Sequence, residues 1–349
     1  MPSHKRPYDT QKVNGDCACC VSVCLPSPNP VFALVPRWLT GLSLFESNEL
    51  RNLSRYVRGY LGGLRSLCVE IEGEEFKYLE GGDGDTIIFL HGILGSKTQW
   101  RSLMQTYTQD YRVVALDIPG LCLHQAFAQK KHSLRQLSIW LESVVDRLRS
   151  DRVHLVCHSM GCALGSYFAA TRPGMVSSLT LMAFPDVFSN RGETLQGLVN
   201  EINAMMTGSD VKPLADYYRR AFADPPNIPN IVLRYNLREV NRFRGRVLQA
   251  VDEFAQSSPL LMAQMRQLRM PCLVINGDQD NICPVFDETF WRMNVPDLEF
   301  VELQDCGHVI HLEKPDEVIF EHRRFLERVD KLLRPEPPED TGQYGVLLD

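Results

Sequence analysis

The feature that most constrains this chain is the stretch VHLVCHSMGCALG at residues 153–165. An apolar, β-branched run leads directly into Ser159, and a run of small residues typical of a helix follows it. Residues two positions before and after the serine, Cys157 and Gly161, are compact, as a sharp turn from strand to helix requires. Such a turn, a nucleophile elbow, projects the serine hydroxyl clear of the sheet. Since Gly is usual where Cys157 stands, we expect slightly looser packing between strand and helix.

Taken alone, this stretch leaves open a second interpretation, in which Ser159 only caps a helix. The rest of the chain supplies the partners that a nucleophile needs. Residues 86–90 are a continuous apolar run, the pattern of a buried parallel strand, and a His-Gly pair follows them. This loop suits a close approach to substrate, with the N–H groups of Ile93 and Met160 forming an oxyanion hole. We expect His91 to be a buried, hydrogen-bonded loop residue without a role in proton transfer.

Two further strand-like runs lie downstream and end in an acid and a histidine. Residues 271–277 lead into an acidic turn that contains Asp280, and residues 298–303 alternate like a strand and lead to His308. Serine is a poor nucleophile at neutral pH, but a neutral imidazole can take its proton. A buried carboxylate then fixes the imidazole tautomer and stabilises the imidazolium. Ser159, Asp280 and His308 are therefore the candidate catalytic residues, in the Ser…Asp…His order.

On these residues the chain resembles the α/β-hydrolases over about residues 66–332, and among them the monoacylglycerol-lipase-like hydrolases and bacterial single-domain lipases. The motifs that carry the resemblance are HGI at 91–93, ALDIPG at 115–120, the elbow at Ser159, GDQD at 277–280, GH at 307–308 and LEKP at 312–315. The resemblance implies an α/β fold with a mostly parallel eight-stranded sheet, helices on both faces and a helical cap inserted before the seventh strand.

The resemblance also bears on the site. In such families the last Asp of a G-x-x-D turn is the triad acid, which points to Asp280; Asp278 and Asp186 stay open as alternatives. Residues 120–124 read GLCLH where relatives usually have G-x-G-x-S, so the shape of this active-site loop is left open. No metal or organic cofactor is implied. Haloalkane dehalogenation and epoxide hydrolysis are disfavoured, because those relatives place Asp where this chain has Ser159.

The 349 residues have an ordinary globular composition, and we expect the hydrolase core in two parts, 66–186 and 266–333, separated by a helical cap at 187–265. Strands are expected at 68–72, 75–80, 86–91, 112–117, 153–158, 178–184, 271–277 and 298–304. Helices are expected at 98–108, 133–149, 160–172, 284–293 and 315–333, and in the cap at 232–244 and 246–254. Apolar stripes in the cap predict a dry acyl pocket above the nucleophile.

The N-terminal region carries features that the core does not need. Residues 1–30 have the composition of a disordered tail and contain Cys17, Cys19, Cys20 and Cys24. Three interpretations stay open for these cysteines: a plain flexible tail, reversible S-acylation, or a zinc site, although the paired C-x2-C spacing is missing. Residues 31–65 are expected to form an apolar and then amphipathic helical segment, which either docks on the hydrolase body or lies on a membrane surface. Residues 334–349 are expected to be a disordered end.

The net charge and the cysteines of the chain bear on its partners and on the compartment in which it works. A net charge of −6 gives no electrostatic footprint for nucleic acid. We find no secretory signal and no window of about 18 uninterrupted apolar residues. We therefore expect reduced thiols and an intracellular protein, cytoplasmic or peripherally membrane-associated through residues 1–64.

The leading functional hypothesis is a serine carboxylester hydrolase that acts on an acylglycerol or another lipid ester, a small-molecule substrate, through an acyl-enzyme. Alternatives are a C–C bond hydrolase or a perhydrolase on the same triad, or a non-catalytic hydrolase-fold binding protein.

Overall fold

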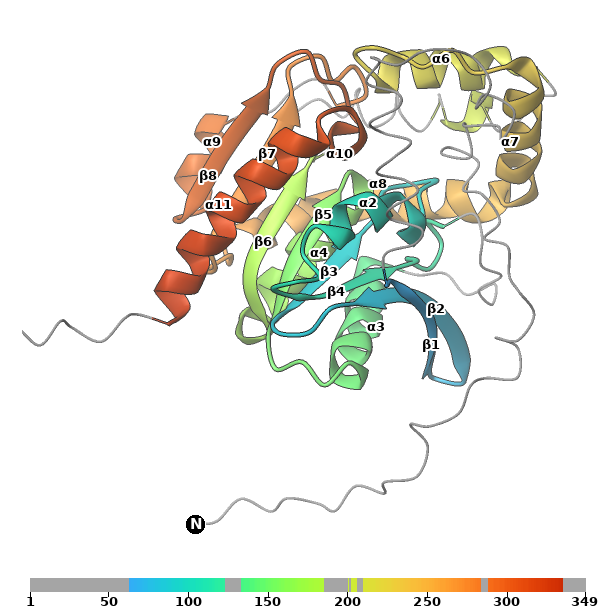
Figure 1. Ribbon diagram of the computed structural model, residues 1–349. Helices are drawn as coiled ribbons and strands as arrows, with labels where there is room; N and C mark the ends of the chain where they lie inside the picture. Colours follow the sequence, from blue (N-terminus) through green and yellow to red (C-terminus); the bar gives the residue numbers. More distant parts are fainter. Residues whose placement is uncertain are drawn as a thin grey trace, which may run out of the picture.

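The computed structural model describes residues 63–122, 133–184, 200, 202–205, 210–283 and 288–334. Their core is one eight-stranded sheet in the order β1-β2-β4-β3-β5-β6-β7-β8, with helices on both faces (Figure 1). Strand β2 runs antiparallel to both of its neighbours, and every other adjacent pair is parallel. This is the α/β-hydrolase arrangement that the sequence predicts.

All eight predicted strands are present, with ends shifted by a few residues. Strand β1 begins at Arg65, within the segment that we expected to be helical up to residue 65. The strands are β1 (Arg65–Ile71), β2 (Glu74–Gly81), β3 (Thr86–Leu90), β4 (Arg112–Leu116), β5 (Val153–His158), β6 (Val176–Met182), β7 (Cys272–Gly277) and β8 (Leu298–Leu303).

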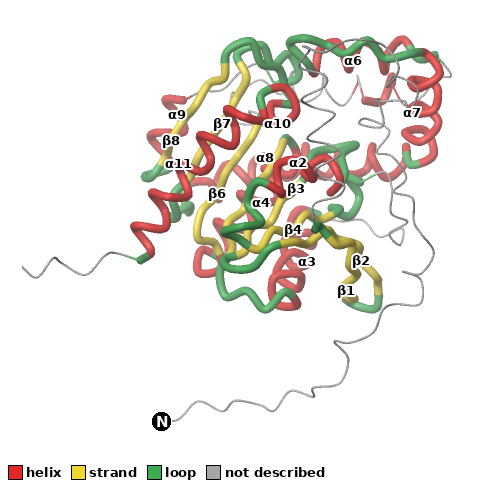
Figure 2. Tube along the Cα trace, in the orientation of Figure 1, coloured by secondary structure: helices red, strands yellow, loops and turns green. Residues whose placement is uncertain are grey.

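The sheet lies between two helical layers, which Figure 2 shows as red helices on either side of the yellow strands. One layer consists of η3 (Lys97–Trp100), α2 (Arg101–Gln105), α10 (Ile310–Glu313) and α11 (Pro315–Leu333); the other consists of α3 (Leu134–Arg147), η4 (Pro173–Met175), α4 (Met160–Thr171), α8 (Arg244–Met265) and α9 (Glu288–Asn294). The single helix expected at 98–108 is therefore divided into η3 and α2.

Local sequence explains why these elements form where they do. Strand β5 is buried along its whole length, with Leu155 facing one helical layer and Val156 the other. A strand covered on both faces needs apolar residues throughout, which is why it reads as a continuous apolar run. Helix α3 begins with a capping box, in which Ser133 and Gln136 each accept a hydrogen bond from the other's backbone N–H.

The cap is inserted between β6 and β7. It contains α6 (Lys212–Ala221) and α7 (Asn230–Arg242), which lie outside the sheet layers (Figure 1), and the start of α8. Helix α8 continues eleven residues beyond the expected end at 254, to Met265. Its later part carries the buried side chains Leu261 and Met265 in the core cluster, and the helix packs on α4. Burial against the core therefore extends a helix that the cap pattern alone predicted too short.

Several predictions fall on residues outside the described part of the chain. These are the N-terminal tail with its cysteines, the apolar and amphipathic segment up to residue 62, Asp186, most of residues 187–209, and the C-terminal end from residue 335. In the ranges that the structure does describe, no helix combines the length and the apolar character needed to span a bilayer.

Candidate active site

Ser159 lies at the turn between β5 and α4, with a left-handed backbone (φ 50°, ψ −126°) that non-glycine residues rarely adopt. The turn is possible because its neighbours are small. A Cβ added to Gly161 would lie 2.5 Å from the carbonyl oxygen of His91, and one added to Gly165 would lie 2.3 Å from the sulfur of Cys157. Cys157 is fully buried and its sulfur occupies the space that Gly165 leaves. Cys157 is thus accommodated because Gly165 has no side chain, and the looser packing expected there stays a prediction.

The structure brings Ser159, His308 and Asp280 together in one hydrogen-bonded chain. His308 Nε2 lies 3.0 Å from Ser159 Oγ, and its Nδ1 lies 2.8 Å from Asp280 Oδ2. All three side chains are buried. Since an ionised carboxylate can only accept, Nδ1 carries the proton, which leaves the lone pair of Nε2 free to accept the serine hydroxyl. This arrangement can remove a proton from Ser159.

The environment of Asp280 favours its ionised form. Its second oxygen, Oδ1, accepts hydrogen bonds from the amides of Ile282 (2.9 Å) and Cys283 (2.8 Å). Burial alone would raise the pKa of this carboxyl, but the His308 ring and the two amides outweigh burial and hold the pKa below its ordinary value. Asp280 can therefore stabilise an imidazolium at neutral pH.

Of the other two candidates for the acid, Asp278 is described and is bonded elsewhere. Its Oδ1 accepts from the amide of Cys306 at 3.1 Å, so it fixes the loop before His308 and does not bond the imidazole. Asp186 lies outside the described residues.

The two residues whose amides are expected to hold an oxyanion, Met160 and Ile93, both lie close to Ser159. Met160 is the first residue of α4, so its N–H has no acceptor within the helix. Ile93 lines the same pocket as Ser159, in a loop so close that a Cβ added to Gly92 would lie 2.8 Å from the Cβ of Ser159. The amide of Leu94 donates to the carbonyl oxygen of Leu121 (3.1 Å). Leu121, in the unusual GLCLH segment, thus contacts the oxyanion loop directly, while Leu123 and His124 lie outside the described residues.

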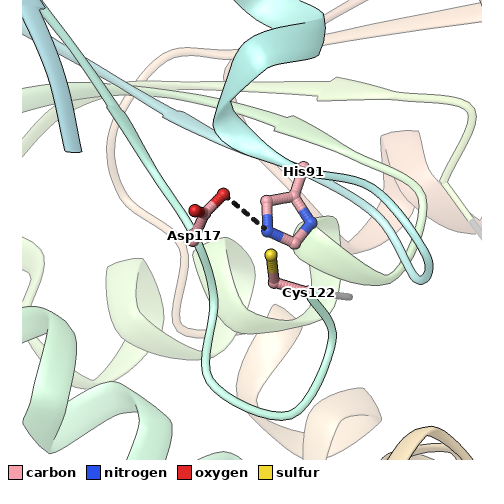
Figure 3. Close-up of side chains that lie close together, drawn as sticks. All are labelled: His91, Asp117 and Cys122. Carbon is pink, nitrogen blue, oxygen red and sulfur yellow. Dashed lines mark ion pairs between the residues drawn. The ribbon is translucent and has the colours of Figure 1, made fainter. Parts of the chain in front are cut away.

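His91 follows β3 and is completely buried, with Asp117 and Cys122 beside it (Figure 3). Its Nδ1 donates to the carbonyl oxygen of Gly92 (2.7 Å), and its Nε2 accepts from the amide of Ile118 (2.9 Å). Because Nε2 accepts, the ring is neutral, and the dashed 4.0 Å approach to Asp117 in Figure 3 joins a carboxylate to a neutral ring. These are the bonds of a residue that shapes the loop.

Three groups of side chains in the described part of the chain bring potential metal-binding atoms within 4.8 Å of one another. The groups are His91–Asp117–Cys122, Asp280–Cys283–His308 and Asp85–His154–Asp330. In the group around His91, the Nε2 lone pair of the histidine already accepts a hydrogen bond, and Asp117 forms an ion pair with Lys97. In the group around His308, the histidine and Asp280 bond each other. The expectation that no metal or cofactor is needed stays a prediction.

A pocket opens above Ser159, and the cap supplies its apolar wall. The cap residues that line it include Leu214, Tyr217, Tyr218, Phe222 and Val240. The hydroxyl of Tyr218 accepts a hydrogen bond from the Asn236 amide (3.2 Å), which satisfies its polar end. The wall is therefore suited to a hydrocarbon chain, as the apolar stripes of the cap predict.

Two further buried histidines surround the catalytic candidates and were not singled out from the sequence. His158 Nε2 donates to the carbonyl oxygen of His308 (3.0 Å), and burial, together with the nearby His308 ring, lowers the pKa of His158 to about 3. The ring centroids of His311 and His158 are 4.8 Å apart, and His311 stacks on Trp100 with a distance of 4.5 Å between the ring centroids. Nothing in the local sequence distinguishes such residues, because these partners lie far away in the sequence.

Comparison with known proteins agrees with this fold. The profile described as the alpha/beta hydrolase fold matches residues 85–315. The chain is 30% identical over 271 residues to the dihydrolipoyllysine-residue acetyltransferase component of the acetoin cleaving system of Pseudomonas putida, covering 74% of this chain and 68% of that protein. It is 27% identical over 309 residues to monoacylglycerol lipase ABHD6 of Homo sapiens, covering 82% and 88%.

Among solved structures, the chain is similar to a bacterial membrane phospholipase A, with a TM-score of 0.71 and 25% identity over 80% of this chain and 91% of that one. The profile match spans more than half of the chain and includes Ser159, Asp280 and His308. The chain therefore belongs to the α/β-hydrolase fold family and, within it, resembles monoacylglycerol lipases and bacterial lipases.

Proposed function

We propose that this protein is a serine hydrolase that cleaves carboxylic esters, with an acylglycerol or another lipid ester as its substrate. The observation that carries the proposal is the hydrogen-bonded chain Asp280–His308–Ser159 at a pocket with an apolar cap wall. The likeness to a human monoacylglycerol lipase and to a bacterial membrane phospholipase A supports the choice of a lipid ester.

In the proposed mechanism, Ser159 Oγ attacks the ester carbonyl carbon while His308 Nε2 takes the hydroxyl proton. The amides of Ile93 and Met160 hold the negative charge that develops on the carbonyl oxygen. His308 then donates its proton to the leaving alcohol oxygen, which leaves an acyl-enzyme on Ser159. Water, activated by the same imidazole, releases the acid, and Asp280 stabilises the imidazolium in both half-reactions.

The cap wall supports a preference for longer acyl chains. Tyr217, Phe222 and Leu214 present apolar surface to the space above the nucleophile. Burying each methylene of a substrate chain contributes about 0.8 kcal/mol of transfer free energy. Specificity measured as kcat/KM should therefore rise with chain length until the pocket is filled.

We also propose that residues 1–64 tether the enzyme to the membrane in which such a substrate lies. The segment combines four cysteines, an apolar stretch and an arginine-bearing amphipathic pattern. A single acyl chain binds a bilayer only marginally, whereas a chain together with an interfacial or basic segment binds stably. Removing residues 1–45 should move the protein towards the soluble fraction and leave hydrolysis of a short soluble ester intact.

The test is a chain-length series of monoacylglycerols and p-nitrophenyl esters, combined with fluorophosphonate labelling of the purified protein. We expect labelling on Ser159 and a kcat/KM that increases with acyl length. Labelling without hydrolysis of any ester, together with cleavage of a diketone, would favour the C–C bond hydrolase instead. Absence of both labelling and hydrolysis would favour a binding protein.

A further inference from the structure

The end of cap helix α6 and the loop that carries His308 are joined through their backbones. The amide of His308 donates to the carbonyl oxygen of Ala221, the last residue of α6, at 2.9 Å. A Cβ added to Gly307 would lie 2.8 Å from that same oxygen and 2.7 Å from the amide nitrogen of Ala223. The cap and the histidine loop therefore approach each other so closely that no side chain fits at Gly307.

One carboxylate, that of Glu313, bridges these two segments. Its Oε2 accepts from the amide of Ala223 in the cap (2.8 Å), and its Oε1 accepts from the amide of Gly307 (3.0 Å), the residue before His308. Both oxygens accept from N–H donors, which is the pattern of an ionised carboxylate. Burial raises the pKa of Glu313, and the amides that donate to it limit the rise.

We propose that Glu313 is a positioning residue, whose carboxylate holds the His308 loop against the cap so that the imidazole stays within reach of Ser159. The inference rests on the proposed ester hydrolysis for its kinetic readout. The amides of Ala223 and Gly307 come from separate segments, so one side chain can satisfy both only if it has two acceptor oxygens. A glutamine would place its amide N–H₂ against one of these donors and leave a buried N–H without an acceptor.

A second contact shows that the same helix end also reaches the loop that carries the acid. Arg220, one residue before Ala221, donates from its guanidinium to the carbonyl oxygen of Asn281 at 2.8 Å. Asn281 directly follows Asp280, so the end of α6 contacts both loops that hold the His308–Asp280 pair. Glu313 is the member of this set whose side chain is partly buried and bridges two backbones, which makes it the residue to test.

The experiment compares Glu313→Gln, Glu313→Asp and the control Glu317→Gln in the full-length protein. Glu317 is exposed, four residues further along the same segment, and its substitution removes the same charge. The measurements are kcat and KM on a short soluble ester, the rate of fluorophosphonate labelling, and the thermal midpoint. Assays are run at a temperature at which every variant is folded.

For Glu313→Gln we expect kcat and the labelling rate to fall together by about 10²-fold, as displacement of a reacting group by about 1 Å can cause, with KM little changed. Glu313→Asp should lose less, because it keeps two acceptor oxygens and places no N–H₂ donor against either amide. Glu317→Gln should match the wild type in every measurement.

Wild-type kcat and labelling rate in folded Glu313→Gln, or a lower thermal midpoint as its sole effect, would overturn the proposal. If Glu313→Gln does not fold, wild-type kinetics in Glu313→Asp would overturn it instead. A wild-type protein without esterase activity would refute the proposed function. The positioning role would then be read from the His308 Nδ1 proton resonance, which should shift in Glu313→Gln and not in Glu317→Gln.

Discussion

The two sides of the candidate site are held by different parts of the molecule. Ser159 stands between β5 and α4 at the centre of the sheet, where Gly161 and Gly165 allow close packing. His308 and Asp280 lie on loops after β8 and β7, and these loops contact the end of cap helix α6. The nucleophile is thus held by a strand and a helix of the core, whereas its base lies on a loop that is bonded directly to the cap backbone.

This difference indicates which substitutions can change the geometry of the candidate site. Changes in α6 of the cap should move Ser159 less, because its backbone is held between β5 and α4. They can move His308, because its amide and the Glu313 carboxylate both bond the cap backbone. We therefore expect core substitutions to act on stability or abolish turnover, and substitutions at the cap contact to act on kcat.

The largest effect is expected from removing the nucleophile. Ser159→Ala should lower kcat by about 10⁴-fold or more and abolish fluorophosphonate labelling, while the thermal midpoint stays near that of the wild type. Ser166→Ala in the same helix is the matched control, since its buried hydroxyl has no role in the proposed chemistry. Near-normal turnover by Ser159→Ala would refute the assignment of the nucleophile.

The acid provides a test on the other side of the site. Asp280→Asn should lower kcat by about 10⁴-fold, because the wrong imidazole tautomer is then stabilised. Asp278→Asn, which changes a carboxylate that accepts from the Cys306 amide and is not bonded to the imidazole, should cost far less. Equal and small losses in both variants would show that Asp280 is not the acid, and a dominant loss in Asp186→Asn would move the acid there.

A smaller effect, on stability and not on kcat, is expected within the core. Gly165→Ala places a methyl group against the Cys157 sulfur and should lower the free energy of unfolding by about 1–3 kcal/mol. Adding Cys157→Gly, the residue usual at this place in the elbow, should restore most of the loss. If the double variant is no more stable than Gly165→Ala in chemical denaturation, the two residues do not share this space.

The smallest expected effect is on how the free energy of unfolding depends on pH. Burial lowers the pKa of His158 and of His322 to about 3, so both are neutral in the folded protein, whereas the unfolded chain takes up protons below about pH 6.5. The unfolded state then binds more protons, and each histidine lowers the free energy of unfolding by up to about 1.4 kcal/mol per pH unit. Stability should therefore fall as the pH falls from 6.5 towards 3.

His322→Gln is the variant for this measurement, because His322 lies on α11 and bonds Tyr107, away from Ser159. Denaturation at pH 7 and pH 5.5 should show a smaller pH dependence in this variant than in the wild type. An identical dependence would mean that His322 is not neutral in the fold or is not buried.

What the sequence predicts and what it misses follow the same division between core and cap. The strand before Ser159 is recognisable because burial on both faces demands a continuous apolar run, and α3 because Ser133 and Gln136 form a capping box. Both signals are local. The length of α8 depends on Leu261 and Met265 packing on the core, and the bridge made by Glu313 depends on two loops that meet only in the folded chain.

The proposed acyl-enzyme can be tested most directly by stopping the reaction of the wild-type protein with a medium-chain ester within one turnover and digesting it. The proposed mechanism predicts a peptide containing Ser159 whose mass is increased by the acyl group, and no such peptide from Ser159→Ala. An acyl group on any other residue, or steady hydrolysis by Ser159→Ala, would contradict it.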